Sequence, residues 1–569
     1  MSTRLSRAAS FRGFLLLAAA LALLAPGEGM AAPAADLVFR GGSIHTVDDS
    51  RPEATALAVK DGRIAFVGDD AGVAAFVGRK TRVVELAGRA LVPGFVDADA
   101  RLLDVARLAQ GVDLYATTSF ADVTRKVAQA ARAVPPNNWV IGWGWDEESW
   151  RDSEPIRLID LQSVSGNRPV LLFHATDDAI IANVSALASA SVPEDLPDPP
   201  GGRVARDMRG VRMGPLMGEA ASLVLRALAV PSTADFQRWY GAAAESCLVR
   251  GVTLVHDGTV PVSARSALSA LWANEKTRPA LGLSVSLKPE PLEFDPVVSS
   301  PPGATDRVGG LSIEGVTFRL DGFVNTRGAA ISHFYYDSPG NRGFLRYSPA
   351  GLVPLAEGVR KAGWRPMFEA HGDSALSIAL GTLALEDPAG QTARPLVSGL
   401  ELIRPDQFAR LAASGAGLVM TPTPMIDGWR WMDNRIGPEA VEQAWAMAEL
   451  AKGSTLALGT GAPFADGRPI LAFYAAVTRQ NLDGRPAGGW KAEQGLTREA
   501  ALRALTIGGA TLLGRDAETG SLAVGKRADL VVLSGDLMTV PEREIPALRV
   551  EMTVAGGRIV HDRAPAVRN

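Results

Sequence analysis

The sequence is poor in the side chains that most often hold metal ions or form cross-links. It contains one cysteine and six histidines in 569 residues. With Cys247 alone, neither an intramolecular disulfide nor a thiolate metal cluster can form. Cys247 also lies in an apolar helical pattern at 240–251, which favours a buried structural thiol. The nearest two histidines, His333 and His371, are 38 residues apart, so the chain has no H-x-H motif.

The chain has no large excess of charge of either sign. Lys and Arg number 58 against 62 Asp and Glu, which leaves a formal net charge of −4 without any long block of like charge. We therefore expect neither a nucleic-acid surface nor an anionic-membrane surface. Hydrophobic residues make up 47% and charged residues 21%, a balance typical of globular proteins.

Long apolar runs are scarce, and the clearest one lies near the N-terminus at 14–25. Arg4, Arg7 and Arg12 precede or flank this run, and small residues follow it at 29–35. This order predicts a signal peptide over residues 1–31 that export would remove. The run is too short for a membrane anchor, which needs about 20 apolar residues. We expect a periplasmic or secreted protein with no membrane span after cleavage.

Both ends of the remaining chain show short β-branched runs separated by turns that contain glycine. The first part covers 36–92, and the second covers 516–562. Strands at the two ends of a chain can pair with each other. We therefore predict one composite β-sandwich domain built from both chain ends.

The middle of the chain, 93–515, alternates apolar strand-like runs with helical patterns. Examples are the runs 251–258, 315–322 and 364–373, and the helical stretch 438–451. Repeated strand–helix units predict a parallel sheet, and this many units predict a closed TIM-type (β/α)8 barrel of the α/β class. The stretch at about 104–250 is assigned to an insertion in the barrel.

Several motifs follow one another in the order of a known family. They are 61-DGRIAFVG-68, 93-PGFVDA-98, 142-GWGWDEESW-150, 251-GVTLVHDG-258 and 519-TGSLAVGKRADLVVL-533. Together they resemble the amidohydrolase superfamily, in particular the amidohydrolase 3 group that includes proteins like N-substituted formamide deformylase. The resemblance implies a barrel that uses one or two divalent ions, such as zinc, to activate water. The implied reaction is hydrolysis of a non-peptide C–N bond.

The residues that should hold those ions have been replaced. Members of this group resemble one another in an H-x-H motif after the first strand, a lysine that becomes carbamylated, two later histidines and a final aspartate. The matching positions in this sequence are Asp99, Arg101, Thr317, Glu369, Gly399 and Gly461. Arginine stays protonated, threonine has no amine to carbamylate, and glycine has no side chain. The sequence therefore predicts no metal and no other cofactor at this site.

The stretch 97-DADAR-101 raises the question of why carboxylates and a guanidinium alternate at the end of the first barrel strand. Buried carboxylates without a cation are costly, and a partnered guanidinium reduces that cost. We hypothesise that Arg101 replaces the lost metal charge and pairs with Asp97, Asp99 or Glu369. The alternative is that these charges simply face solvent in a loop.

Three functional hypotheses remain open. In the first, the protein is a catalytically degenerate amidohydrolase that binds a small molecule or another protein. In the second, it is a structural subunit that pairs with an active relative or with itself as a homo-oligomer. In the third, it is an active hydrolase that uses a rebuilt site for a single cation, or a carboxylate–histidine pair. The candidate residues for such a pocket are Asp97, Asp99, Arg101, Glu369, His371 and Asp373.

Overall fold

The computed structural model describes residues 34–563 except 109–110, 116, 136–137, 148–149, 151–157, 177–178, 194, 207–208, 211, 291–292 and 385–393. The predicted signal peptide at 1–31 therefore lies outside the described residues. Within the described part of the chain, no helix is long and apolar enough to cross a membrane.

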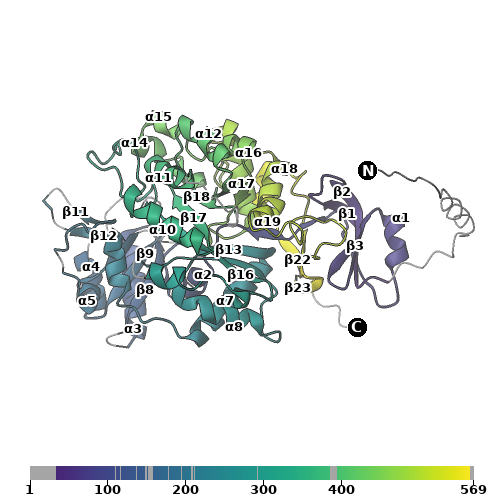
Figure 1. The fold of residues 1–569 in the computed structure, drawn as a ribbon, viewed down its shortest axis with the longest axis horizontal. Coiled ribbons are helices and arrows are strands. Elements are labelled where there is room, and N and C mark those ends of the chain that lie inside the picture. The colour runs from purple at the N-terminus through teal and green to yellow at the C-terminus, as the bar shows by residue number, and fades with distance from the viewer. Residues whose placement is uncertain are drawn as a thin grey trace, which may run out of the picture.

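The two ends of the chain form one eight-stranded sheet, as the sequence predicts (Figure 1). Its hydrogen-bonded order is β23-β22-β21-β5-β1-β2-β3, and β4 pairs with β1. The strands are β1 (Leu37–His45), β2 (Glu53–Lys60), β3 (Arg63–Gly68), β4 (Arg82–Glu85), β5 (Ala90–Pro93), β21 (Leu530–Leu533), β22 (Val550–Ala555) and β23 (Arg558–Asp562). The short helix α1 (Asp70–Val73) accompanies this sheet.

Strand β21 connects this sheet to the rest of the molecule. It pairs antiparallel with β5, which belongs to the N-terminal part of the chain. Successive side chains of a strand point to opposite faces. Leu530 and Val532 pack in the core of the composite sheet, whereas Val531 and Leu533 pack in the large core that includes the barrel. One strand thus contributes to two cores.

Eight parallel strands form the nearly closed barrel. They follow the order β20-β19-β18-β17-β16-β14-β13-β6. Their bounds are β6 (Phe95–Asp97), β13 (Val252–Val260), β14 (Gly282–Leu287), β16 (Leu311–Arg319), β17 (Arg365–Ala370), β18 (Leu396–Gly399), β19 (Gly417–Met420) and β20 (Leu456–Leu458). A hydrogen bond from Ala98 N to Leu458 O (3.2 Å) joins the two ends of this order.

Helices cover the outside of the barrel and connect its strands. The longer ones bury apolar side chains against the strands. They are α2 (Leu102–Leu108), α7 (Thr233–Val249), α8 (Arg265–Ala273), α10 (Pro349–Lys361), α11 (Asp373–Leu383), α12 (Pro405–Ser414), α16 (Met447–Gly453), α17 (Pro469–Thr478) and α18 (Arg498–Arg503). Shorter ones are α9 (Phe294–Val298), α13 (Met425–Gly428), α14 (Met432–Ile436), α15 (Pro438–Val441) and α19 (Gly509–Leu512).

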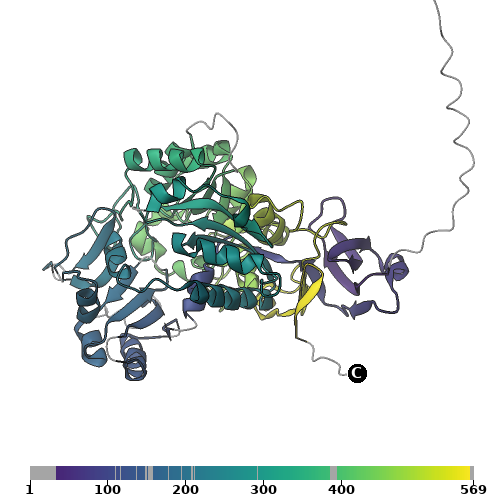
Figure 2. The ribbon, with the colours of Figure 1, turned by 60° about the horizontal axis from the view of Figure 1, so that its bottom comes forward.

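A third sheet lies within the stretch 104–250 that the sequence assigns to an insertion. Its order is β11-β12-β10-β9-β8-β7. The strands are β7 (Val112–Asp113), β8 (Val140–Trp145), β9 (Val170–His174), β10 (Ala179–Ala182), β11 (Gly202–Arg206) and β12 (Arg212–Gly218), with helices α3 (Phe120–Ala133), α4 (Leu158–Ser165), α5 (Val184–Ser189) and α6 (Glu219–Leu225). Figures 1 and 2 place this unit at the end of the barrel away from the composite sheet. The domain bounds drawn from the sequence stay predictions.

The barrel interior has an apolar layer beneath its polar end. This layer consists of Ala98, Met367, Leu396, Val419, Ala457 and Leu512. Side chains that point inward recur at every second residue of a strand. On β17 the inward positions are therefore Met367, in the apolar layer, and Glu369, one layer closer to the carboxyl ends of the strands. This alternation places Glu369 at the barrel mouth.

Candidate functional site

The carboxyl ends of the barrel strands open into a cavity of about 330 Å³. This is the end at which TIM-barrel proteins carry their active sites. The apolar part of its wall includes Phe323, Ile426, Trp431, Trp445, Phe464 and Leu471. Its polar groups include Asp99, Arg101, Glu369, His371, Glu401 and Thr421. The cavity thus combines an ionic base with aromatic and aliphatic walls.

Glu369 is the centre of the ionic group. Arg101 Nη2 lies 3.2 Å from Glu369 Oε1, and Arg319 Nε donates to Glu369 Oε2 at 3.0 Å. Arg319 reaches Glu369 because the two residues are direct partners in the register of β16 and β17. The Glu369 side chain is only 8% exposed. Of the three carboxylates suggested for Arg101, the structure therefore pairs it with Glu369.

His371 continues the network on the other side of Glu369. Its Nε2 lies 3.3 Å from Glu369 Oε1, and its Nδ1 lies 3.2 Å from Glu401 Oε1. The Phe323 ring covers the imidazole, with ring centroids 3.9 Å apart. Because a carboxylate faces each ring nitrogen, the protonated imidazolium fits this position best.

Burial and neighbouring charges act in opposite directions on these two groups. Burial alone would lower the pKa of His371, but Glu401 and Glu369 outweigh it and raise that pKa to about 10. Burial would raise the pKa of Glu369, yet Arg319, Arg101 and His371 hold that pKa well below its usual range. At neutral pH, His371 is therefore a cation and Glu369 an anion.

The two aspartates at the end of the first barrel strand, Asp97 within β6 and Asp99 after it, occupy different places. Asp99 lines the cavity and accepts a hydrogen bond from Thr421 Oγ1 at 2.8 Å. Asp97 instead bonds to the backbone N–H and hydroxyl of Thr460 and to the backbone N–H of Asp99. Burial raises the pKa of both carboxyls, that of Asp97 to about 6. Asp97 therefore ties β6 to the segment after β20, whereas Asp99 is available to the cavity.

Asp373 lies apart from the cavity. Its carboxylate accepts from Ser332 N and from Arg404 Nη1, both at 2.9 Å. It lines a separate groove formed with segments 332–339, 402–405 and 436–443. The structure thus brings together Asp99, Arg101, Glu369 and His371 but not Asp97 and Asp373.

The six residues that the resemblance assigns to metal-ligand positions do not fit a divalent metal centre. Five of them, Asp99, Arg101, Glu369, Gly399 and Gly461, line the cavity, and Thr317 is buried on β16. The group next to Glu369 consists of two guanidinium groups and an imidazolium, which have no lone pair to offer a cation. At Gly399, a Cβ atom would lie 2.6 Å from Ala370 O, so this position has no room for a ligand side chain.

Sequence reasoning missed two members of the ionic group, Arg319 and Glu401. Arg319 lies two residues after Thr317 on the same strand, so strand alternation alone would have placed it on the inward face. Glu401 lies two residues beyond the end of β18. Polar residues just after barrel strands are candidates for the mouth, and this rule would have included Glu401.

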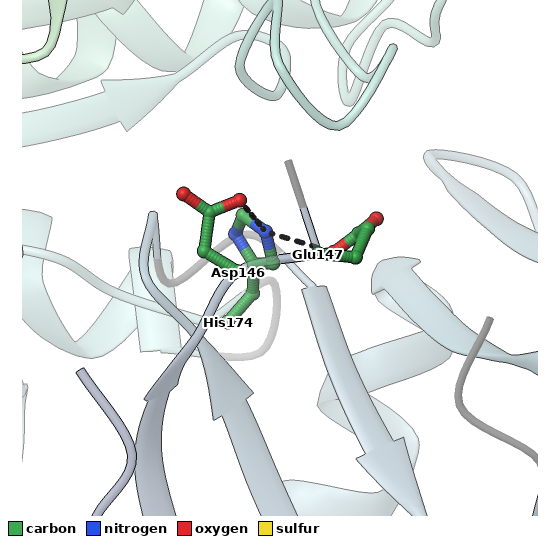
Figure 3. A group of neighbouring side chains, drawn as sticks. All are labelled: Asp146, Glu147 and His174. Carbon is green, nitrogen blue, oxygen red and sulfur yellow. Dashed lines mark ion pairs between the residues drawn. The ribbon is translucent and has the colours of Figure 1, made fainter. Parts of the chain in front are cut away.

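A second polar group lies at the edge of the cavity, where β8 and β9 of the insertion end. Among the described residues, Asp146, Glu147 and His174 are the group that brings three ligand-type atoms within 4.8 Å of one another (Figure 3). Asp146 also lines the cavity. Sequence reasoning gave these three residues no metal-binding role, because no spacing motif connects Asp146 with His174.

Comparisons with known proteins agree with the fold. The protein YtcJ of Bacillus subtilis is 26% identical over 531 residues, which cover 93% of this chain and 99% of YtcJ. N-substituted formamide deformylase of Arthrobacter pascens is 27% identical over 551 residues, covering 93% of this chain and 98% of that protein. An uncharacterized metal-dependent hydrolase from Pyrococcus horikoshii superposes with a TM-score of 0.70 at 23% identity, covering 89% of this chain and 99% of the other.

The model of the amidohydrolase family matches residues 82–561. This match spans the barrel, the insertion and the strands β4, β5, β21, β22 and β23 of the composite sheet. The resemblance read from the sequence motifs is therefore confirmed, and the protein belongs to the amidohydrolase family.

Proposed function

We propose that this protein is an exported binding protein that uses the amidohydrolase barrel to hold a small organic molecule, without hydrolysis by a metal at the barrel centre. The observation that carries the proposal is the set of contacts to Glu369. Arg101, Arg319 and His371 all lie within 3.3 Å of its carboxylate oxygens. These cations occupy the space next to the carboxylate that a divalent ion would need.

The charges of this group balance without a metal ion. Three cationic side chains, Arg101, Arg319 and His371, lie among three carboxylates, Asp99, Glu369 and Glu401. Buried charges are tolerated when they are paired and hydrogen-bonded. A divalent cation added here would meet like charges at short range, which disfavours its binding.

The alternative is an active hydrolase with a carboxylate–histidine pair at the same place. A general base needs a free lone pair at working pH. His371 lies between two carboxylates, which raise its pKa to about 10 against the effect of burial, so it holds its proton at neutral pH. The geometry therefore supports His371 as a charged structural group rather than as a base.

The cavity favours an uncharged ligand with an apolar part. Its base is already neutral overall, and Trp431, Trp445 and Phe464 supply apolar wall. A volume of about 330 Å³ is at the lower end of the range for small-molecule sites. One relative is an N-substituted formamide deformylase, which makes uncharged N-substituted amides the first class of ligand to test.

The experiment measures binding and turnover of a panel of N-substituted formamides on the same sample. Calorimetry reports binding, and an amine assay with and without Zn²⁺ reports hydrolysis. We expect saturable binding without amine release. Ala465→Trp, which fills the cavity rim, should weaken binding at least tenfold. Ala75→Trp, an exposed position in the composite domain, is the matched control and should not change binding.

Two results would overturn this proposal. One is the absence of saturable binding to any uncharged amide of the panel. The other is release of amine that disappears in the His371→Gln variant, since that would show that the histidine takes part in catalysis. Export is tested separately: the mature protein should appear outside the cytoplasm with its N-terminus near residue 32, and retention of residues 1–31 would contradict that part of the proposal.

A further inference from the structure

The rim group consists of Asp146, Glu147 and His174. Trp145, the last residue of β8, is paired with His174, the last residue of β9, so the two following carboxylates come to lie beside the imidazole. Figure 3 shows His174 between Asp146 and Glu147, with its Nε2 directed toward both. The Nε2 atom is 3.7 Å from Asp146 Oδ1 and 3.5 Å from Glu147 Oε2.

These two distances are too long for good hydrogen bonds but suit atoms that share a metal ion. An N–H···O hydrogen bond has a typical N···O distance of about 2.9 Å. Ligands at about 2.1 Å from a tetrahedral ion lie roughly 3.4 Å from one another. His174 Nε2 is therefore spaced from each carboxylate oxygen like a second ligand of one ion, and all three atoms lie within 4.8 Å of one another.

The surroundings of the three side chains also support the interpretation that they bind a metal ion. Glu147 Oε2 is enclosed, and within the described residues no donor makes a hydrogen bond to it. The ring of His174 is fixed by an edge-on contact with Trp145, with centroids 4.5 Å apart. A buried acceptor without a donor is costly, and a bound cation would remove that cost.

Thr176 contacts Nδ1 of His174 through two groups, and the two contacts suit opposite tautomers of the ring. Its hydroxyl oxygen lies 2.8 Å from Nδ1 and can accept a hydrogen bond from a protonated Nδ1, which leaves the lone pair of Nε2 for a metal. Its backbone N–H also approaches Nδ1, at 3.1 Å, and suits the opposite tautomer, in which Nε2 donates toward the carboxylates. The first tautomer corresponds to an ion-bound state and the second to an ion-free state.

We propose that Asp146, Glu147 and His174 bind one divalent transition-metal ion, with Zn²⁺ the best match. One imidazole nitrogen and two carboxylate oxygens are ligands that zinc accepts, and three protein ligands leave a position open. The site lies on the insertion, separate from the ionic group around Glu369 on the barrel strands. Because Asp146 and Thr176 line the cavity, a molecule in the cavity can approach the ion.

The test measures metal stoichiometry and affinity on the full mature protein. After treatment with a chelator, the protein is titrated with Zn²⁺ and Co²⁺, and bound metal is measured by elemental mass spectrometry. The absorption of bound Co²⁺ gives a second readout that does not depend on activity. We expect about one ion per chain, and binding at least tenfold weaker in His174→Asn and in Asp146→Asn. Asp146 has a partly exposed side chain, so its variant should fold normally.

The matched control is His45→Asn. His45 also contacts a carboxylate, Asp536, at 2.8 Å, but no third ligand was found at that place among the described residues. This variant should keep the full metal content. The proposal is overturned if the wild type binds no stoichiometric ion, or if folded His174→Asn binds it unchanged. The outcome is independent of the proposed function, which concerns the barrel centre and is tested by binding of uncharged amides.

Discussion

At the scale of single residues, the chemistry of the barrel mouth depends on which partner each carboxylate has. A carboxylate that accepts from two arginines, as Glu369 does, has its lone pairs directed at guanidinium groups. Breaking such a buried pair is strongly destabilising because it leaves uncompensated charge. Arg101 and Arg319 are therefore needed for the stability of the barrel mouth as well as for its chemistry.

The protonation of His371 predicts how stability depends on pH. Its folded-state pKa of about 10 lies above that of a free histidine, about 6.5. The stabilisation from its charge is therefore fully present below about pH 6.5 and is lost as the pH rises through 10. We expect the wild type to lose more stability between pH 7 and pH 9.5 than His371→Gln does, measured by urea unfolding. Equal losses in the two proteins would contradict the assignment.

At the scale of elements, the ends of β16 and β17 are held in register by one buried carboxylate. Asp321 accepts backbone hydrogen bonds from Ala330 at 2.9 Å, His371 at 3.0 Å and Gly372 at 2.8 Å. Gly372 packs so closely that a Cβ there would lie 2.0 Å from Ala330 O. These three hydrogen bonds to Asp321 fix the backbone from which the His371 side chain reaches the cavity.

We predict that Asp321→Asn destabilises the protein by about 1–3 kcal/mol. The NH₂ group of asparagine would replace one of the two carboxylate oxygens, so at least one backbone N–H would lose its acceptor. The measurement is the midpoint of urea unfolding at pH 8. Burial raises the pKa of Asp321 to about 7, so most of the carboxyl is ionised at this pH. Asp61→Asn, a change at an exposed turn, serves as the control and should stay within about 0.5 kcal/mol. An unchanged midpoint in Asp321→Asn would show that the backbone hydrogen bonds to the Asp321 carboxylate do not contribute to stability.

Sequence reasoning reached the elements more easily than the site. Strand alternation and helical periodicity predict the barrel and the composite sheet, because each element must bury an apolar face. The motif after the first strand identifies Asp99 and Arg101 as neighbours of the mouth. The partners of Glu369 and His371 come from strands and loops far apart in the chain, such as Arg319 and Glu401. No local pattern records those pairings, and only the barrel register brings them together.

At the scale of the whole molecule, the composite sheet and the barrel share cores. Alternate residues of β21 pack into the two of them, with Leu530 and Val532 in one and Val531 and Leu533 in the other. The β5 strand, which leads into the first barrel strand, pairs with β21. Unfolding of the sheet therefore removes apolar contacts from the barrel as well.

We predict that the composite sheet and the barrel unfold together. Scanning calorimetry of the mature protein should show both in a single transition, and Leu530→Ala should lower the temperature of that transition as a whole. Val524→Ala, at a position 63% exposed, should leave it unchanged. Two separate transitions, of which only one responds to Leu530→Ala, would show that the shared strand does not couple the two units.

The absence of a metal ion from the barrel centre is tested most directly by elemental mass spectrometry of the His174→Asn variant, in which the rim group has lost its histidine. We expect no stoichiometric ion in this variant after incubation with Zn²⁺, Mn²⁺ or Ca²⁺ and desalting. Arg101, Arg319 and His371 already satisfy Glu369. A stoichiometric ion that remains in His174→Asn and disappears when Glu369→Gln is added would contradict this expectation, because it would place a metal at the centre of the barrel.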